Sequence, residues 1–338
     1  MKNLKKSLKN KSGLLFFAGS LLLFVTIIFA LASGSTGISF VKLWNAVLNP
    51  GETGTYGIIL RYIRIPRVVA SLLSGAALAA SGCVLQSVLS NRLASPGIIG
   101  VNAGAGLGVT LCAFFGVASG IVFSVSAFLG AGIASAVIML AAFRTHASKT
   151  MVILGGVAVN SILNAVAESL SVLNPDAALM SIDFRVGGFS AVSQTRLLPA
   201  VVVIVSALIV LLTLCNELDV LSLGDETAGG LGMNVKRMRI VFLILASLLS
   251  GASVSFAGLL GFVGLIVPNL IRGMVGDKSS LLLPLSAIYG AFFVTLSDTV
   301  ARVAFSPYEI PVGIIMALVG GPVFIALLIK SRGGRKNA

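Results

Sequence analysis

Long runs without charge constrain this chain more than any other feature of its sequence. Residues 12–41 contain no charged side chain, and runs of similar character recur along most of the chain. A helix that crosses a bilayer needs about 20 mainly apolar residues. Of the 338 residues, 57% are hydrophobic and 10% are charged, which is too little charge to keep so much apolar surface in water. The sequence therefore predicts an all-α polytopic membrane protein.

The lengths of these runs predict about ten membrane-spanning helices. The expected spans are residues 14–32, 68–89, 98–117, 120–143, 151–173, 197–215, 240–261, 262–275, 281–303 and 312–329. The eighth run is short, and Pro268 is expected to bend its helix or to begin it. Helix packing in lipid favours small residues, which fits the 38 glycines of the chain.

The basic residues predict the orientation of the chain in a cytoplasmic membrane. Ten spans place both termini on one side, and assigning that side to the cytoplasm leaves 7 of the 24 lysines and arginines outside. These are Lys42, Arg61, Arg64, Arg67, Arg185, Arg196 and Arg302. The other 17 (24 − 7), including those of the basic segments 1–11 and 330–338, lie inside, as the positive-inside rule requires. Topology therefore explains the net charge of +13, and no nucleic acid is expected as a partner.

The chain lacks the patterns that enzymes and ion-coupled transporters use. It has no G-x-x-x-x-G-K-[ST] phosphate loop, and no nucleophile–base pair indicates an enzyme. Only Glu168 and Asp298 are clear acidic residues within the spans, which disfavours an ion-coupled secondary transporter. Such a transporter, built on inverted repeats, is the alternative function, and a non-transporting scaffold also stays open. No metal is expected, because the cysteines have no metal-ligand or disulfide spacing and are interpreted as packing residues; they are Cys83, Cys112 and Cys215.

The longest polar interruption on the predicted cytoplasmic side is the segment 216–239. Ser222 and Asp225 have the spacing of a capping box, which predicts a short helix from Asp225 to about Leu231 that ends at Gly232. This helix is either an ordinary solvated loop helix or a docking helix for a cytoplasmic partner. In the second case Leu223, Ala228 and Leu231 would supply apolar contacts, and Gly229, Gly230 and Gly232 would allow close approach. The full candidate set is Ser222, Leu223, Gly224, Asp225, Glu226, Ala228, Leu231 and Gly232.

Arginines gather on the predicted outer side, against the positive-inside trend. The stretch "RYIRIPR" places Arg61, Arg64 and Arg67 just before the second span, and Arg302 follows Asp298 by four residues. One interpretation is a lipid-headgroup anchor together with an Asp298–Arg302 pair on one helix. The other is a positively charged rim that docks an acidic partner.

The heptapeptide "ASLLSGA" occurs at residues 70–76 and again at 246–252. The second and seventh spans carry the copies, so the two run in opposite directions through the membrane. We interpret them as equivalent helices of two inverted half-repeats, residues 68–173 and 240–329, although a chain so rich in Ala, Ser, Leu and Gly could also match by chance. Each copy has small residues at i, i+4 and i+8, as in a close helix–helix seam. The two seams are Ser71, Gly75 and Ala79, and Ser247, Gly251 and Ser255.

Several segments resemble the FecCD family of ABC importer permeases, which take up ferric siderophores, haem and cobalamin. These segments are "RIPRVVASLLSGAALAASGCVLQSVLSNRLASPGIIGVNAGAGLG", "LGMNVKRMR", "SFAGLLGFVGLIVPNLIRGMVGD" and "LSDTVARVAFSPYEIPVGIIMALVGGPVFIALL". The resemblance covers the chain from about residue 56 to residue 329. It implies a ten-helix permease in the cytoplasmic membrane of a prokaryote, carrying an iron–siderophore or a related haem- or cobalamin-type chelate.

The resemblance also implies partners and sites. A second permease subunit, identical or homologous, two cytoplasmic ATP-binding subunits and an extracytoplasmic substrate-binding protein would complete the importer, with ATP and Mg on the ATPase subunits. Residues 222–232 would form the coupling helix that docks on the ATPase. Arg64, Arg67 and Arg302 match the family's docking site for the binding protein, and Arg61 falls outside that match.

The resemblance places the translocation path between two protomers, along the fifth and tenth spans. Residues 144–150 resemble the inner gate of the family, although weakly. Asn269 stands where the family often has histidine, so a role tied to an imidazole does not transfer to this chain.

Overall fold

The computed structural model describes residues 2–33, 55–117, 119–144, 149–306 and 308–333. Lys42, the centre of the expected inner gate at 145–148, and the end of the basic tail at 334–338 lie outside the described residues. The described part is helical, with connecting turns and no strand. Its α-helices are α1 (Lys2–Ala32), α3 (Thr55–Ile59), α4 (Ile65–Val88), α5 (Val101–Phe114), α6 (Gly120–Arg144), α7 (Lys149–Leu173), α8 (Pro175–Val186), α9 (Gln194–Thr213), α10 (Cys215–Ser222), α11 (Asp225–Gly230), α12 (Val235–Ala257), α13 (Val263–Val275), α14 (Ser279–Val303) and α15 (Val312–Gly333).

The prediction of an all-α membrane protein is confirmed. Within the described residues, seven helices are long and apolar enough to cross a membrane. The other three expected spans coincide with shorter apolar helices, Val101–Phe114, Val263–Val275 and the Val312–Ala326 part of α15. The count of ten spans therefore stays a prediction.

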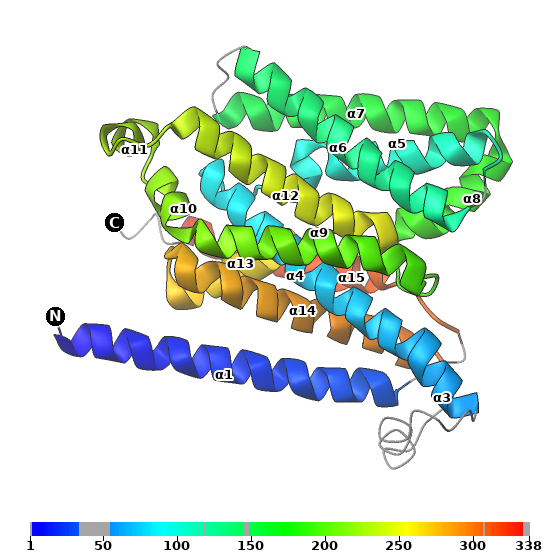
Figure 1. The fold of residues 1–338 in the computed structure, drawn as a ribbon, viewed down its shortest axis with the longest axis horizontal. Coiled ribbons are helices and arrows are strands. Elements are labelled where there is room, and N and C mark those ends of the chain that lie inside the picture. The colour runs from blue at the N-terminus through cyan, green and yellow to red at the C-terminus, as the bar shows by residue number, and fades with distance from the viewer. Residues whose placement is uncertain (1, 34–54, 118, 145–148, 307, 334–338) are drawn as a thin grey trace.

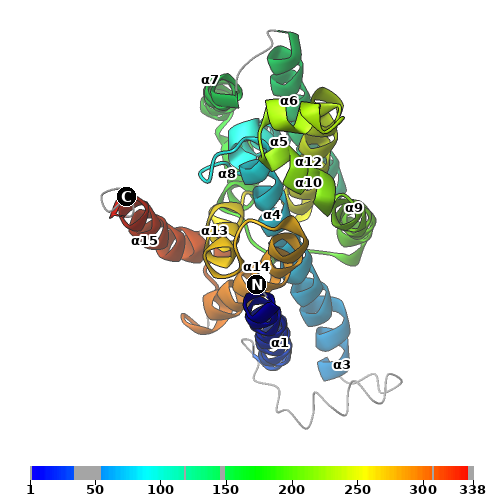
Figure 2. The same ribbon diagram turned by 90° about the vertical axis from the view of Figure 1, so that its left-hand side faces the viewer.

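Helix α4 crosses the middle of the molecule and is its most enclosed span (Figures 1 and 2). It packs mainly against α14 on one side and α12 on another. Figure 1 shows α11 and both termini at one end of the bundle and α3 and α8 at the opposite end. We call these the α11 end and the α8 end, and topology predicts that they face the cytoplasm and the outside.

The two heptapeptide copies lie on α4 and α12, which pack against each other and run antiparallel. The hydroxyls of Ser74 and Ser253 are 2.6 Å apart, and the Ser81 hydroxyl donates to the Ala246 carbonyl at 2.7 Å. Seven positions forward on α4 (74 to 81) thus correspond to seven positions backward on α12 (253 to 246). The copies therefore run in opposite directions, as predicted.

The contacts of the two halves correspond helix by helix. Helix α5 packs against α6 and α7, just as α13 packs against α14 and α15, and α4 meets α14 as α12 meets α6. This correspondence fits an inverted repeat. The boundaries 68–173 and 240–329 stay predictions.

The two small-residue seams face different neighbouring helices and pack against them at different distances. On α4, a Cβ atom at Gly75 would overlap the Gly290 carbonyl of α14, and the Ser71 hydroxyl lies 3.0 Å from that of Thr295. On α12, Gly251 faces Ala131 and Phe128 of α6, where a Cβ would be in ordinary contact at 3.5 Å. The α4–α14 seam is closed, whereas the α12–α6 seam is loose.

The arginine-rich stretch before the second expected span is itself helical. A π-helical segment, Leu60–Arg64, joins α3 to α4, so the apolar helix begins at Gly57 and not at residue 68. Pro66 lies at the second position of α4, directly after the π-helical segment. Its missing N–H therefore falls where the π-helical hydrogen-bond pattern passes into the α-helical one.

Pro268 lies inside α13 and neither begins nor ends it. A proline at this position leaves the carbonyl four residues earlier, that of Gly264, without its helical donor. The Gln86 amide of α4 replaces it, donating to the Gly264 carbonyl at 3.2 Å and to the Leu265 carbonyl at 3.3 Å. This replacement explains how the short helix tolerates proline in its interior.

Candidate functional site

The first candidate site is the short helix α11, which protrudes at the α11 end (Figure 1). It begins after Gly224, whose φ of 105° is accessible mainly to glycine. It ends in a Schellman-type turn, in which Gly232 has a φ of 84°, its N–H donates to the Gly229 carbonyl, and that of Met233 donates to the Ala228 carbonyl. The predicted helix is present, and its last residue is Gly230.

The predicted capping box is wrong. The Ser222 hydroxyl donates to the Asp219 carbonyl at 2.7 Å, because Ser222 is the last residue of α10 and binds a carbonyl of its own helix. Gly224 is the N-cap residue of α11 and offers no side chain. The Asp225 carboxylate is instead directed at α12.

Asp225 joins α11 to two longer helices. Its carboxylate oxygens lie 2.6 and 2.7 Å from Nη2 of Arg239 on α12, and Lys149 Nζ of α7 lies 3.5 Å away. The Arg239 hydrogen bond and the nearby positive charges hold the pKa of the Asp225 carboxyl below its usual range. The carboxylate therefore stays charged at physiological pH.

The exposure of the α11 region separates residues that a partner can reach from those it cannot. Leu223 and Leu231 are 62% and 64% exposed, and Ser222, Glu226 and Gly232 are also exposed. Ala228 is fully buried, so it anchors α11 and does not offer the apolar contact that was predicted for it.

Helix α10 connects α11 firmly to the core. Leu218 and Leu221 are fully buried. The Asp219 carboxylate accepts a hydrogen bond from the Ser279 N–H at 2.7 Å, which satisfies a free donor at the first turn of α14. A force on α11 can therefore reach both α12, through Arg239, and α14, through Asp219.

The second candidate site is a cluster of charges toward the α8 end, which we call the arginine cluster. Its members are the buried Arg64, Arg67, Asp298 and Arg302 and the exposed Glu309. Arg67 lies 2.9 Å from Asp298 and 2.7 Å from Glu309. Arg302 Nε lies 3.3 Å from Asp298 Oδ2, as the i,i+4 spacing predicts. Asp298 thus serves two arginines.

The arginine cluster also holds the end of α1. Arg64 donates to the carbonyls of Leu31 and Ala32 at 2.7 and 2.9 Å, and Arg302 donates to those of Ala30 and Ser33 at 3.1 and 3.2 Å. The last carbonyls of a helix lack intrahelical donors and carry partial negative charge. The two guanidinium groups therefore cap α1 and fix it beside α4 and α14.

The arginines interpreted as a positively charged outer rim are mostly enclosed by their own chain. Arg64, Arg67 and Arg302 are buried, with exposed fractions of 4%, 9% and 4%, because they neutralise acidic groups and carbonyls of their own chain. Arg61 is exposed. The docking role of the buried three stays a prediction, and Glu309 is a member of the cluster that sequence reasoning missed.

The remaining predicted positions lie outside the arginine cluster, and of them only Lys149 also contacts the α11 region. The Asn269 amide donates to the Arg92 and Leu265 carbonyls, both at 2.8 Å, so it holds the connection after α4 against α13. Lys149, next to the expected inner gate, donates to the Ser90 hydroxyl at 2.8 Å. The cysteines are free, with Cys83 and Cys215 buried and Cys112 half-buried.

Comparisons with known proteins agree over nearly the whole chain. The model of the FecCD transport family matches residues 22–330. The hemin transport system permease protein HmuU of Yersinia pestis is 34% identical, covering 94% of this chain and 96% of its own. The iron(3+)-hydroxamate import system permease protein FhuG of Bacillus subtilis is 34% identical, covering 96% and 99%. A solved metal-chelate type ABC transporter in an inward-facing conformation superposes with a TM-score of 0.84 at 32% identity, covering 93% of this chain and 98% of that one.

Proposed function

The chain belongs to the FecCD transport family and is a multi-pass permease of an ABC importer, and from this premise we propose that its cargo is an iron–siderophore. A related haem- or cobalamin-type chelate is the second choice within the same class. The observation that carries the proposal is the match over nearly the full length to permeases whose names specify hemin and iron(3+)-hydroxamate.

ATP would be hydrolysed on two separate cytoplasmic subunits, which bind ATP and Mg. Their docking site on this chain would be α11 and its flanking residues Leu223 and Leu231, which expose apolar side chains beside the charged Asp225 and Glu226. The binding of α11 to Arg239 and of α10 to Ser279 would pass its movement to α12 and α14. Because α4 packs between these two helices, their movement would open the transport path alternately to the outside and to the cytoplasm.

A second permease subunit, identical or homologous, would cover the faces of α7 and α15. Both helices lie on one side of the bundle, opposite α9 (Figure 2). They expose apolar side chains, among them Leu154, Ile162 and Leu318, which are 63%, 63% and 67% exposed. The path for the cargo would lie between the two subunits, and both termini would be cytoplasmic.

The extracytoplasmic binding protein would dock at the α8 end, beside the arginine cluster. Glu309 is the reachable member, with 37% of its side chain exposed, and it occupies Nη1 of Arg67 at 2.7 Å. An acidic side chain of the binding protein would compete with Glu309 for that guanidinium. Glu309→Gln should therefore tighten docking at low salt, and unchanged or weaker docking would reject this competition.

The decisive test is uptake by the reconstituted importer. Vesicles holding this permease, its ATPase subunits and its binding protein should accumulate radioactive ferric siderophore only with internal ATP. Replacing residues 225–231 by a Gly/Ser linker should leave ATP hydrolysis but stop uptake. Accumulation driven by an ion gradient without the ATPase subunits would establish the alternative, a secondary transporter.

A further inference from the structure

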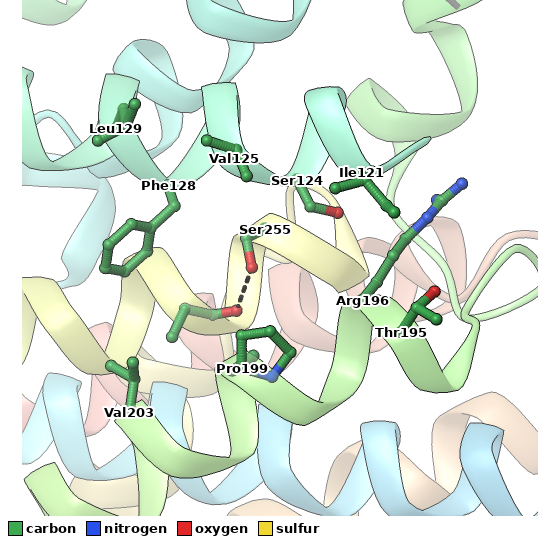
Figure 3. Close-up of a pocket in the computed structure, with 12 residues that line it drawn as sticks. Ile121, Ser124, Val125, Phe128, Leu129, Thr195, Arg196, Pro199, Val203 and Ser255 are labelled. Atoms are coloured by element: carbon green, nitrogen blue, oxygen red, sulfur yellow. Dashed lines mark hydrogen bonds between the residues drawn. The ribbon is translucent and has the colours of Figure 1, made fainter. Parts of the chain in front are cut away.

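A groove of about 190 Å³ lies between α6, α9 and α12, toward the α8 end (Figure 3). Its walls are mostly apolar, and the lining side chains include Ile121, Val125, Phe128, Pro199, Val203 and Ala252. Val125 and Leu129 at its edge are 51% and 55% exposed. In a chain that crosses a membrane, such an edge meets lipid, so the groove opens toward the acyl chains.

Two of the three hydroxyls that line the groove already donate to backbone carbonyls, and the third, that of Thr195, lies 3.0 Å from the Ser193 hydroxyl. Ser124 donates to the Gly120 carbonyl at 3.1 Å, and Ser255 donates to the Ala252 carbonyl at 2.8 Å. Figure 3 shows the second of these bonds on the floor of the groove. Neither hydroxyl needs its hydrogen for a ligand, so the groove favours an apolar occupant along most of its length.

One charged group stands at the mouth of the groove. Arg196, in the first turn of α9, extends past Ile121 (Figure 3) and lies against Gly120, where any side chain would overlap the guanidinium. No hydrogen bond or ion pair joins this guanidinium to another of the described residues. The N-terminal ends of α6 and α9 meet here and add their partial positive charge. The site therefore attracts an anion directly above an apolar channel.

The other half of the molecule supplies an internal comparison. Helix α14, the counterpart of α6, is covered by α1, where the Tyr289 hydroxyl donates to the Leu15 carbonyl at 3.1 Å and the ring packs on Gly19. Helix α9 packs against α12 and only slightly against α6. The groove therefore lies open beside α6 in the first half, whereas α14 in the second half is covered by α1.

The length of the groove suits one leaflet of a bilayer. The lining residues Ile121 and Leu129 are eight positions apart on α6, which corresponds to about 12 Å at 1.5 Å per residue. Half of a hydrocarbon core of about 30 Å is about 15 Å. The charge at one end and the apolar length below it thus match the two parts of a phospholipid.

We propose that the groove binds an anionic phospholipid, with its phosphate on Arg196 and one acyl chain between α6 and α9 over Ala252 and Ser255. The lipid replaces the packing that α9 does not supply to α6. This proposal requires only that the chain spans a membrane, so it stands independently of the cargo and of the ATPase subunits.

The test is native mass spectrometry of the full-length permease, stripped of lipid and mixed with equal amounts of phosphatidylglycerol and phosphatidylcholine of identical acyl chains. The intact chain should retain one phosphatidylglycerol with a preference of about fivefold, the effect expected from one basic residue near anionic lipid. Arg196→Gln should abolish the preference, and Arg196→Lys should keep most of it. Arg61→Gln, which removes an exposed arginine at the same end, is the matched charge control and should change nothing.

A second pair of variants tests the apolar channel. Ser255→Leu should fill the groove and reduce retention of both lipids, whereas Ser247→Leu, two turns away on the same α12 seam, lines the neighbouring groove and should not. Equal loss from Arg61→Gln and Arg196→Gln would overturn the proposal, because it would show a diffuse charge effect. Full retention in Ser255→Leu, with folding confirmed by circular dichroism, would also overturn it.

Discussion

Arg67 and Asp298 are 231 positions apart, yet they form a bidentate ion pair in the interior of the protein. Arg67 Nη2 and Nε lie 2.9 and 3.1 Å from the two carboxylate oxygens, and the side chains are only 11% and 2% exposed. The pair binds α4 to α14. Through the neighbouring arginines, it also determines where α1 ends.

Asp298→Asn should destabilise the protein strongly, because it leaves the buried Arg302 without its carboxylate and leaves Arg67 paired only with the partly exposed Glu309. Breaking a buried pair by removing one partner costs about 3–5 kcal/mol. Thermal unfolding of the detergent-solubilised protein would measure the loss. Asp183→Asn, at an exposed position of α8, is the control and should change stability little; equal effects of the two variants would contradict the assigned role of the cluster.

The two heptapeptides offer a matched pair of glycine substitutions. Gly75→Ala would place a methyl group on the Gly290 carbonyl, and overpacking of this kind costs about 1–3 kcal/mol or more. Gly251→Ala meets Ala131 at an ordinary 3.5 Å and replaces a helical glycine, so it should be neutral or stabilising by up to about 1 kcal/mol. The measurement is the unfolding temperature of each variant, and Gly75→Ala should unfold at the lower temperature. A lower unfolding temperature for Gly251→Ala would refute the difference between the seams.

The Gln86–Pro268 relationship predicts a rescue. Gln86→Leu should cost about 1–3 kcal/mol, because the Gly264 carbonyl loses the donor that replaces the proline's missing N–H. Adding Pro268→Ala restores a backbone donor, so the double variant should regain much of the loss. Unfolding of the unaltered protein, the two single variants and the double variant gives the coupling free energy between Gln86 and Pro268. Additive losses of stability would show that Gln86 does not compensate for the proline.

The sequence predicted the helices well because the apolar runs and the small-residue seams are local signals. The opposite directions of the heptapeptides also followed from counting spans. The sequence does not predict how closely each seam packs against its neighbouring helix. Both copies carry a glycine at the same position, and only the neighbour, Gly290 or Ala131, decides whether the seam is closed. That neighbour is distant in sequence and has no local signal.

The candidate sites divide in the same way. The spacing of Ser222 and Asp225 predicted a short helix that is present, but the capping box itself is absent. Ser222 donates to a carbonyl of its own helix, and Asp225 pairs with Arg239. The charge pattern of the sequence identified Arg64, Arg67 and Arg302 as candidates, but it did not predict that they are buried. Asp298 and Glu309 become partners of Arg67 only through the packing of α4 against the end of α14 and the segment after it.

Asp225→Asn should uncouple ATP hydrolysis from uptake without unfolding the protein. The ion pair between Asp225 and Arg239 lies at the surface, with Asp225 half-exposed, so its loss should lower the free energy of unfolding by less than about 1 kcal/mol. The same substitution removes the charged connection between α11 and α12. The measurement is the ratio of siderophore transported to ATP hydrolysed in the reconstituted importer. Glu226→Gln, one residue along α11, is the control and should keep the ratio.

The pH dependence of this effect follows from the lowered pKa of Asp225. A carboxylate with a lowered pKa in the folded state stabilises at pH values above its ordinary pKa of about 3.9, and the stabilisation disappears only as the pH falls through the lowered value. Between pH 5 and 8 the ion pair therefore stays intact. The difference in coupling ratio between the unaltered protein and Asp225→Asn should be constant over that range, and a difference that shrinks toward pH 5 would contradict the assigned charge state.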